Sequence, residues 1–298
     1  MQDKPDRCGY VAIVGAPNAG KSTLLNRVVG TKLAIVTPKA QTTRNRILGI
    51  TLRENAQIIF VDTPGIFRAK EKFERAMVES ALVGARDADM VLLVVDAVRG
   101  ITRTVENVLA RLKHVSAPTH LVLNKVDKAS KAELLALTKA LCDIMNFEGV
   151  FMLSALTGDG VEDLLKMVAN GMPEGHWLYP EDQFTDLSER FIAAEVTRER
   201  LFMRLQQELP YQIAVETETW EERKDGSVKI QQVIYVRTDA HKKIVIGNRG
   251  EMLKEIGASA REQLERLQNR RVHLFLFVKV SENWKDNREF YDALGLDY

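Results

Sequence analysis

Cysteine is scarce in this chain of 298 residues, and neither sign of charge dominates. The two cysteines, Cys8 and Cys142, lie far apart and match no metal-binding or disulfide spacing. They favour a reducing compartment and argue against a small disulfide-stapled fold. Basic and acidic residues number 42 and 41, so the chain as a whole does not attract polyanions. Any nucleic-acid binding must therefore use a local basic patch.

Long hydrophobic runs are also missing. No apolar stretch approaches the ~20 residues that a helix needs to cross a bilayer. The polar start of the chain, Met1 to Arg7, lacks the apolar core of a signal peptide. We therefore expect a soluble, cytoplasmic protein, and association with a membrane surface stays open.

The first half of the chain alternates short β-branched apolar runs with longer amphipathic stretches. This pattern is typical of an α/β domain with helices on both faces of a mostly parallel sheet. Ligands of such domains lie on the loops at the carboxyl ends of the strands. The expected strands are 10–14, 46–52, 56–61, 90–95, 120–123 and 150–153.

A domain boundary is expected between Gly171 and Asp186, where two prolines and two glycines interrupt any helix. Beyond it, the pattern predicts a smaller α+β domain with strands near 212–219, 229–236 and 272–280 and a helix near 251–267. We therefore expect a first domain over 1–172, a linker over 173–187 and a second domain over 188–298.

A phosphate-binding loop follows the first expected strand, where Gly15 to Ser22 reads Gly-x-x-x-x-Gly-Lys-Ser. Its glycines let backbone N–H groups and the next helix terminus face an anion. Lys21 adds a positive charge toward the β- and γ-phosphates, and Ser22 offers a hydroxyl to Mg²⁺. The expected nucleotide-binding residues here are Gly15, Ala16, Pro17, Asn18, Ala19, Gly20, Lys21, Ser22 and Thr23.

Two further motifs complete the expected phosphate and metal site. Asp62-Thr63-Pro64-Gly65 ends the third strand, where the carboxylate can hold Mg²⁺ and the Gly65 N–H can meet the γ-phosphate. A switch segment is expected at Gln41 to Arg44, with one threonine binding Mg²⁺ only when the γ-phosphate is present. We favour Thr43 for this role, and Thr42 stays an alternative.

Base recognition is expected from Asn124-Lys125-Val126-Asp127 after the fifth strand. The carboxylate of Asp127 can accept two hydrogen bonds from guanine, and adenine would leave it unpaired. The loop Ser154-Ala155-Leu156, after the sixth strand, is the expected partner, with the Ala155 N–H bonding guanine O6. These residues predict a GTPase, in which Lys21, Thr43, Asp62, Gly65 and Asn18 carry the hydrolysis.

The four motifs, in this order, resemble the translation-factor-related class of P-loop GTPases. The segments 15–26 and 39–44, with the motifs at 62–65 and 124–127, resemble the Era family in particular. The resemblance implies GTP and GDP as ligands, with Mg²⁺. It also implies a P-loop GTPase domain followed by a type II KH domain, over nearly the whole chain.

Hydrolysis is expected to be slow, because Ile66 stands where Ras-like proteins place the glutamine that orients water. Asn18 matches the asparagine that helps related GTPases hold K⁺ beside the phosphates, where it can offset transition-state charge. Potassium activation is therefore a hypothesis, and a simple turn-stabilising role for Asn18 is the alternative.

RNA binding is expected at Gly247-x-x-Gly250, which lies between an apolar run and a helix. The surrounding order of helix, two strands, two helices and strand resembles the type II KH fold, whose glycine loop approaches single-stranded RNA. The competing interpretation is that the lysines form a solvated face. The expected RNA-binding residues are Lys242, Lys243, Ile246, Gly247, Asn248, Arg249, Gly250 and Lys254.

By resemblance, the second domain binds the 3′ end of 16S rRNA, and the nucleotide state controls that binding during assembly of the small (30S) ribosomal subunit. The resemblance further implies a monomer and leaves open a peripheral association with the cytoplasmic face of the inner membrane. Two rivals remain: a second domain that docks protein or membrane, and a binding module in which GTP is only structural.

Overall fold

The structure is a computed structural model that describes residues 5–39, 43–67, 72–282 and 284. The described residues form two compact units. The first unit holds the residues up to Ala34 and the segment Thr43–Asp186. The second unit holds the described residues of Ile35–Thr42 and of Leu187–Tyr291. The short segment after Ala34 therefore groups with residues far along the chain.

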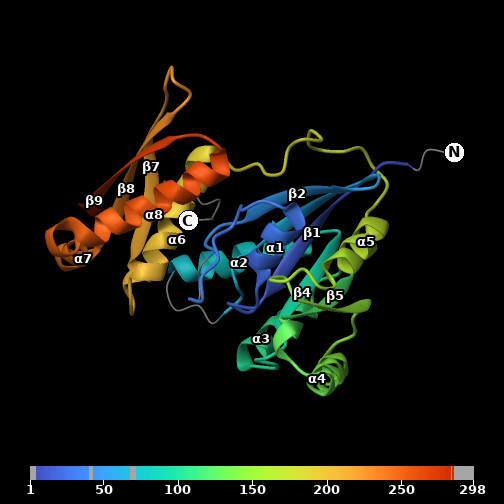
Figure 1. The fold of residues 1–298 in the computed structure, drawn as a ribbon. Coiled ribbons are helices and arrows are strands. Elements are labelled where there is room, and N and C mark those ends of the chain that lie inside the picture. The colour runs from blue at the N-terminus through green and yellow to red at the C-terminus, as the bar shows by residue number, and fades with distance from the viewer. Residues whose placement is uncertain (1–4, 40–42, 68–71, 283, 285–298) are drawn as a thin grey trace. The chain divides into compact units, whose positions relative to one another are not determined.

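A six-stranded sheet with the order β2-β3-β1-β4-β5-β6 forms the centre of the first unit (Figure 1). Only β2 and β3 pair antiparallel, and the remaining pairs are parallel. The expected strands are all present with slightly different ends, and the central β3 and β4 are buried along their whole length, as continuous β-branched runs predict. The strands are β1 (Arg7–Gly15), β2 (Ile47–Arg53), β3 (Ala56–Asp62), β4 (Met90–Asp96), β5 (Thr119–Asn124) and β6 (Gly149–Leu153).

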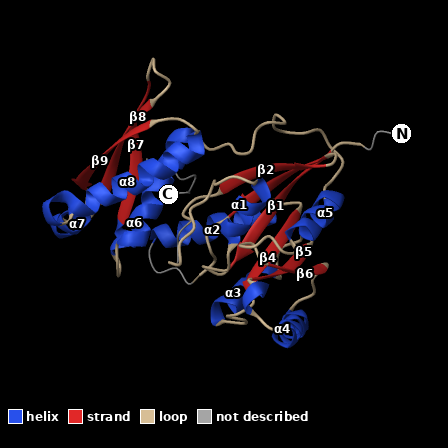
Figure 2. Ribbon diagram, viewed as in Figure 1, coloured by secondary structure: helices blue, strands red, loops and turns tan. Residues whose placement is uncertain are grey.

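Helices cover both faces of this sheet (Figure 2). One face packs against α2 (Lys72–Arg86), α3 (Arg103–Leu112) and α4 (Lys131–Ile144) in one apolar cluster. The opposite face packs against α1 (Lys21–Val29) and α5 (Val161–Gly171). This arrangement confirms the expected α/β class and brings the loops after β1, β3, β4, β5 and β6 to one edge.

The residues expected to form a linker lie along the β2 and β3 end of the first unit. The amide oxygen of Gln57 accepts hydrogen bonds from the backbone N–H groups of Leu178 and Tyr179, at 2.9 and 3.0 Å. The Trp177 indole donates to the Asn55 carbonyl at 3.3 Å and packs on the cluster around Ile59. This stretch is therefore anchored to the first unit up to Asp186.

The second unit contains a three-stranded sheet with the order β7-β8-β9. Its strands are β7 (Ile213–Glu222), β8 (Val228–Val236) and β9 (Val272–Val280), with β7 antiparallel and β9 parallel to β8. Two long helices, α6 (Glu189–Arg204) and α8 (Glu251–Gln268), pack on one face, and a short helix α7 (Asp239–Ile246) precedes α8 (Figure 1). The order is helix, strand, strand, helix, helix and strand, as expected.

The segment that begins at Ile35 differs from expectation, because the sequence predicts that it belongs to the first domain. The backbone N–H of Val36 donates to the Glu199 carboxylate on α6 at 2.8 Å. The Lys39 ammonium donates to the carbonyl oxygens of Phe202 and Leu205 at the end of the same helix. These long-range polar contacts place the segment with the second unit. No helix among the described residues is long and apolar enough to span a bilayer.

Candidate functional site

The phosphate-binding loop connects β1 to α1 and brings its backbone close to the strand-end loops. Gly20 caps α1 with a left-handed φ of 98° and has no side chain to occupy the first helical N–H groups. A Cβ atom at Gly20 would lie 2.1 Å from the Asn124 amide nitrogen. Glycine therefore fits both the dihedral angle and the space, and the helix terminus is left to bind an anion.

Lys21 and Asp62 form a buried pair of opposite charge at the centre of the loop. The Lys21 ammonium donates to the carbonyl oxygens of Gly15 and Ala16 at 3.3 and 3.2 Å. Burial lowers the pKa of Lys21, and the nearby Asp62 charge opposes that change. Burial raises the pKa of Asp62 from 3.8 to about 6, against the Lys21 charge and the hydroxyls of Ser22 and Thr43. Both groups therefore lack the solvation that a charge requires.

Three oxygen atoms of the expected metal ligands converge beside this pair. The Ser22 hydroxyl lies 2.6 Å from the Asp62 carboxylate and 2.8 Å from the Thr43 hydroxyl, and Thr43 lies 3.4 Å from the same carboxylate. The other Asp62 oxygen, Oδ1, is buried without a hydrogen-bond partner in the described part of the chain. Hard oxygen ligands of this kind fit Mg²⁺ that also binds phosphate oxygens. Thr42 lies outside the described residues.

The segment after Asp62 turns back against the phosphate-binding loop. The Thr63 hydroxyl donates to the Ile13 carbonyl at 3.0 Å, and a Cβ atom at Gly65 would lie 3.0 Å from Pro17. Ile66 follows, and it is buried in the apolar cluster that supports α2 and α3. Its side chain therefore faces the core and offers no polar group to a water molecule.

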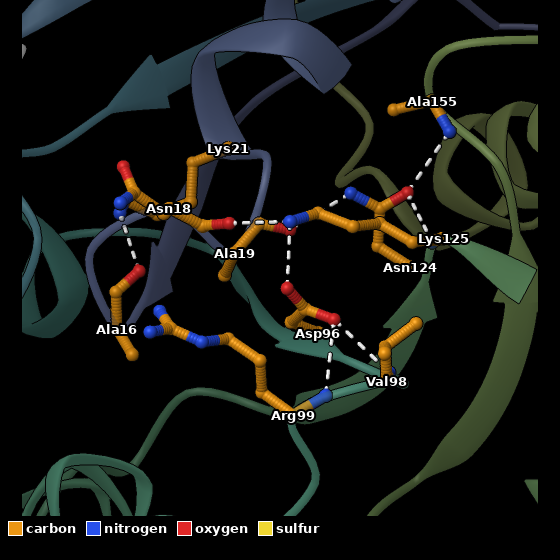
Figure 3. A network of polar contacts seen from close by, with 10 residues as sticks. All are labelled: Ala16, Asn18, Ala19, Lys21, Asp96, Val98, Arg99, Asn124, Lys125 and Ala155. Carbon is orange, nitrogen blue, oxygen red and sulfur yellow. Dashed lines mark hydrogen bonds and ion pairs between the residues drawn. The ribbon is translucent and has the colours of Figure 1, made fainter. Parts of the chain in front are cut away.

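The expected base-binding residues are clamped to the phosphate-binding loop (Figure 3). The Asn124 amide donates to the Ala19 carbonyl at 2.8 Å, and the Lys125 ammonium donates to the Asn18 carbonyl at 2.8 Å. Asn18 adopts a left-handed φ of 64°, which asparagine tolerates, so its turn-forming role is real in this structure. The loop and the base-binding motif thus form one connected scaffold.

Asp96, at the end of β4, completes this scaffold and was not singled out from the sequence. One carboxylate oxygen accepts from the Lys125 ammonium at 2.6 Å, and the other accepts from the backbone N–H groups of Val98 and Arg99 at 3.0 and 3.3 Å (Figure 3). The carboxylate is almost fully buried, so the ion pair is weakly screened. The position of Asp96 at the carboxyl end of a buried strand, where ligand-binding loops begin, could have marked it as a candidate site residue.

The loop containing Ala155 differs from the expectation in one contact. Its N–H already donates to the Asn124 amide oxygen at 2.9 Å, so guanine O6 would have to share or replace that acceptor. Arg27 on α1 holds this loop by donating to the Ala155 carbonyl at 3.2 Å and to the Leu156 carbonyl. Asp127 follows β5 in a short 3-10 turn, and its side chain is exposed. The Asp127 carboxylate is therefore accessible to a ligand.

The second candidate site is the loop between α7 and α8. Gly247 ends α7 with a φ of 75°, and a Cβ atom there would lie 2.6 Å from the Cβ atom of Met252. Gly250 caps α8 with a left-handed φ of 84°, so the first N–H groups of α8 have no side-chain cap. Arg249 also adopts a left-handed φ, of 48°. The N–H groups of Gly247 and Gly250 donate to the carbonyl oxygens of Lys243 and Gly247, while the side chains of Asn248 and Arg249 are exposed.

The expected RNA-binding residues gather around this loop. Lys243, Asn248, Arg249 and Lys254 are exposed, whereas Lys242 and Ile246 are partly buried. The apolar residues of α7 differ in their burial. Val245 is fully buried, but the Ile244 side chain is 54% exposed, because neighbouring residues on a helix point about 100° apart.

Comparisons with known proteins match both units. A family model described as a 50S ribosome-binding GTPase matches residues 10–125, and a KH domain model matches residues 208–285. GTPase Era of Sinorhizobium medicae is 53% identical over 99% of this chain and 95% of that protein. GTPase Era of Rhizobium meliloti is 54% identical over 99% of this chain and 94% of that protein. The chain belongs to the GTPase Era family.

Solved structures of Era support the same assignment. An Aquifex aeolicus Era variant bound to GDP and AlF4 matches with a TM-score of 0.92 and 39% identity, over 97% of this chain and 99% of that one. A structure of Era in complex with MgGDPNP and nucleotides 1506–1542 of 16S ribosomal RNA matches with the same values. The expected fold, a P-loop GTPase domain followed by a KH domain, is confirmed.

Proposed function

We propose that this chain is a slow GTPase whose nucleotide state controls binding of its second unit to the 3′ end of 16S rRNA during assembly of the small ribosomal subunit. The convergence of Ser22, Thr43 and Asp62 beside the phosphate-binding loop supports the nucleotide part of the proposal. The exposed glycine loop between α7 and α8 supports the RNA part. The solved Era complex with MgGDPNP and 16S rRNA supports their combination in one chain.

In the GTP-bound state, the α1 N–H groups and Lys21 bind the phosphates, and Ser22, Thr43 and Asp62 hold Mg²⁺. This ion offsets negative charge on the phosphate oxygens. The Gly65 N–H faces the γ-phosphate, so loss of that phosphate removes one reason for Thr43 and Gly65 to stay in place. Asn124, Lys125 and Asp127 hold the base, and the Ser154 to Leu156 loop closes over it.

Hydrolysis proceeds slowly in this proposal, because the core-facing Ile66 cannot orient water. Asn18 would help to hold K⁺ beside the phosphates, where the ion would supply positive charge against the negative charge that develops during hydrolysis. Turnover measured in KCl and in NaCl at equal ionic strength tests this step. Faster turnover in KCl is expected, and equal rates would leave Asn18 with its turn-forming role alone.

RNA contacts the second unit at the α7–α8 loop. Gly247 and Gly250 let the backbone approach the sugar-phosphate chain, and Arg249 and Lys254 neutralise phosphates. The overall charge of the chain is +1, so this local cluster must supply the attraction. The resemblance also implies a monomer and leaves open a peripheral association with a membrane. Size-exclusion chromatography and flotation with anionic vesicles test them.

The deciding experiment is fluorescence anisotropy of a short RNA that copies the 3′ end of 16S rRNA, with a scrambled RNA as control. Each RNA is titrated with the full chain in Mg²⁺ with GTP analogue, with GDP and without nucleotide. The proposal expects tighter binding to the rRNA sequence and a dependence on nucleotide. Weak binding that ignores both sequence and nucleotide would leave a GTPase whose KH domain has another partner.

A further inference from the structure

The segment that leads into the expected switch is held at three places along the chain. Before it, the Asn26 amide oxygen on α1 accepts from the backbone N–H groups of Leu33 and Ala34, both at 2.9 Å, and the Asn26 amide donates to the Ala34 carbonyl at 2.8 Å. After it, Thr43 lies among the metal ligands. Between these two anchors, Ile35 to Lys39 belongs to the second unit. We refer to residues 35–39 as the tether.

The tether is fixed to α6 by two kinds of polar contact. Glu199 is fully buried, and its carboxylate accepts the Val36 N–H at 2.8 Å and lies 3.6 Å from the Arg200 guanidinium. A buried carboxylate is costly unless hydrogen bonds compensate it, so the Val36 N–H stabilises the Glu199 charge. Displacing the tether would remove that donor from a group that water cannot reach.

Lys39 supplies the second contact at the end of the same helix. Its ammonium donates to the carbonyl oxygens of Phe202 and Leu205. The last carbonyl groups of a helix have no partner within the helix and carry partial negative charge, so a cation there is favourable. Ile35 and Thr37 are buried beside these contacts. The tether is therefore a packed part of the second unit, and only three residues separate Lys39 from Thr43.

We propose that Glu199 and Lys39 are positioning residues that couple the nucleotide site to the RNA-binding unit, by anchoring to α6 the tether that leads to Thr43. The inference rests on the proposed function, because it assumes that RNA affinity depends on nucleotide. A change in Thr43 position on loss of the γ-phosphate would pull on the tether, and α6 packs against the β7–β9 sheet that supports the glycine loop. Binding energy that differs between nucleotide states is thereby transmitted along the covalent chain.

The test compares RNA affinity of the full chain with GTP analogue and with GDP, using the rRNA-derived oligonucleotide in Mg²⁺. For the unaltered chain we expect the two dissociation constants to differ by roughly ten-fold, within the usual range of coupling. Lys39→Met keeps the aliphatic stem but removes the ammonium. It should bring the ratio close to one, while the affinity for each nucleotide in the absence of RNA stays unchanged.

A second pair of variants separates coupling from folding. Glu199→Ala removes the acceptor for Val36 and should also abolish the ratio, whereas Glu199→Gln keeps an acceptor of the same length and should retain most of it. Lys32 lies in the first unit ahead of the tether, and Lys32→Met is therefore the matched control for Lys39→Met. Arg204→Met is the control on α6, because Arg204 is exposed and forms an ion pair with the exposed Glu255 at 3.2 Å. Both controls should keep the full ratio.

The possible outcomes distinguish this inference from the proposed function. If Lys39→Met and Glu199→Ala keep the ratio of the unaltered chain, the tether does not couple the sites, although the proposed function stands. If Arg204→Met loses the ratio as completely as Lys39→Met, the effect belongs to α6 in general and the inference is wrong. If the unaltered chain binds RNA with the same affinity in GTP analogue and in GDP, the proposed control of RNA binding by nucleotide is wrong. The inference about the tether is then wrong as well.

Discussion

Replacing Asp62 with asparagine should stabilise the nucleotide-free chain, although it removes a residue that the nucleotide site needs. Burial raises the pKa of Asp62 from 3.8 to about 6, even with Lys21 beside it. Each pKa unit corresponds to about 1.4 kcal/mol. Well above pH 6, the ionised carboxylate therefore costs the folded protein about 3 kcal/mol relative to the unfolded chain. Asp62→Asn removes this cost because the amide mimics the protonated carboxyl group.

The stabilisation by Asp62→Asn should increase with pH. At pH 8 the carboxylate is ionised in both folded and unfolded chains, so the full cost is present. As the pH falls through 6, the folded-state carboxyl takes up a proton first and the cost shrinks. Only well below the ordinary pKa of 3.8 are both states protonated, and there the difference between the two chains disappears. The stabilisation by Asp62→Asn should therefore be largest at pH 8 and roughly half as large at pH 5.

Differential scanning calorimetry of the full chain in EDTA without nucleotide measures this effect. About 3 kcal/mol corresponds to a rise of about 6 to 12 °C in the transition of a unit this size. Asp143→Asn, at an exposed position on α4, is the matched control and should leave the transition unchanged. In excess GTP and Mg²⁺ the unaltered chain should have the higher transition temperature, because ligand that binds only the folded chain stabilises it and Asp62→Asn lacks a residue that the nucleotide site needs. An equal or lower transition temperature for Asp62→Asn at pH 8 would refute the reasoning.

Three further predictions concern single side chains at the two candidate sites. Asp96→Asn should lower the affinities for GDP and for GTP about ten-fold alike, because it removes the charge that holds Lys125. The preference for guanine over adenine should stay intact, and titration with fluorescent nucleotides checks both effects. Arg27→Met should lower guanine-nucleotide affinity several-fold by releasing the Ala155 loop, and faster nucleotide dissociation in stopped-flow should show it. Arg249→Ala should weaken all RNA sequences alike and reduce the slope of log affinity against log salt by about one, with the GTPase rate unchanged.

The strands of the first unit and the order of elements in both units could be predicted from the sequence. Buried parallel strands need continuous β-branched runs, and such runs are local features. The phosphate-binding loop was also predictable, because its glycines and Lys21 are adjacent in sequence and follow a strand. The structure places Thr43, the favoured threonine, beside Ser22 and Asp62.

The features that could not be predicted from the sequence all depend on long-range contacts. Arg27 meets the Ala155 loop across more than a hundred residues, and nothing local to α1 marks it for that contact. The contacts of the tether with α6 could not be predicted, because Val36 and Lys39 carry no sequence pattern that indicates α6 as their partner. The exposure of Ile244 could not be predicted, because hydrophobicity alone does not tell which face of a short helix is covered. Pairing and burial of this kind are decided by tertiary packing.

The same electrostatics that cost stability in the nucleotide-free chain explain why the site should bind nucleotide tightly. The buried Lys21 ammonium donates to the carbonyl oxygens of Gly15 and Ala16, and Oδ1 of Asp62 is buried without a hydrogen-bond partner among the described residues. A phosphate and a divalent cation would each satisfy one of these charges, so binding recovers solvation that folding removed. The cost is therefore localised at the two residues that touch the ligand. A substitution that removed the buried charge of Lys21 or Asp62 would stabilise the nucleotide-free chain. It would also reduce the difference in free energy between the nucleotide-free and nucleotide-bound states, on which a nucleotide-controlled switch depends.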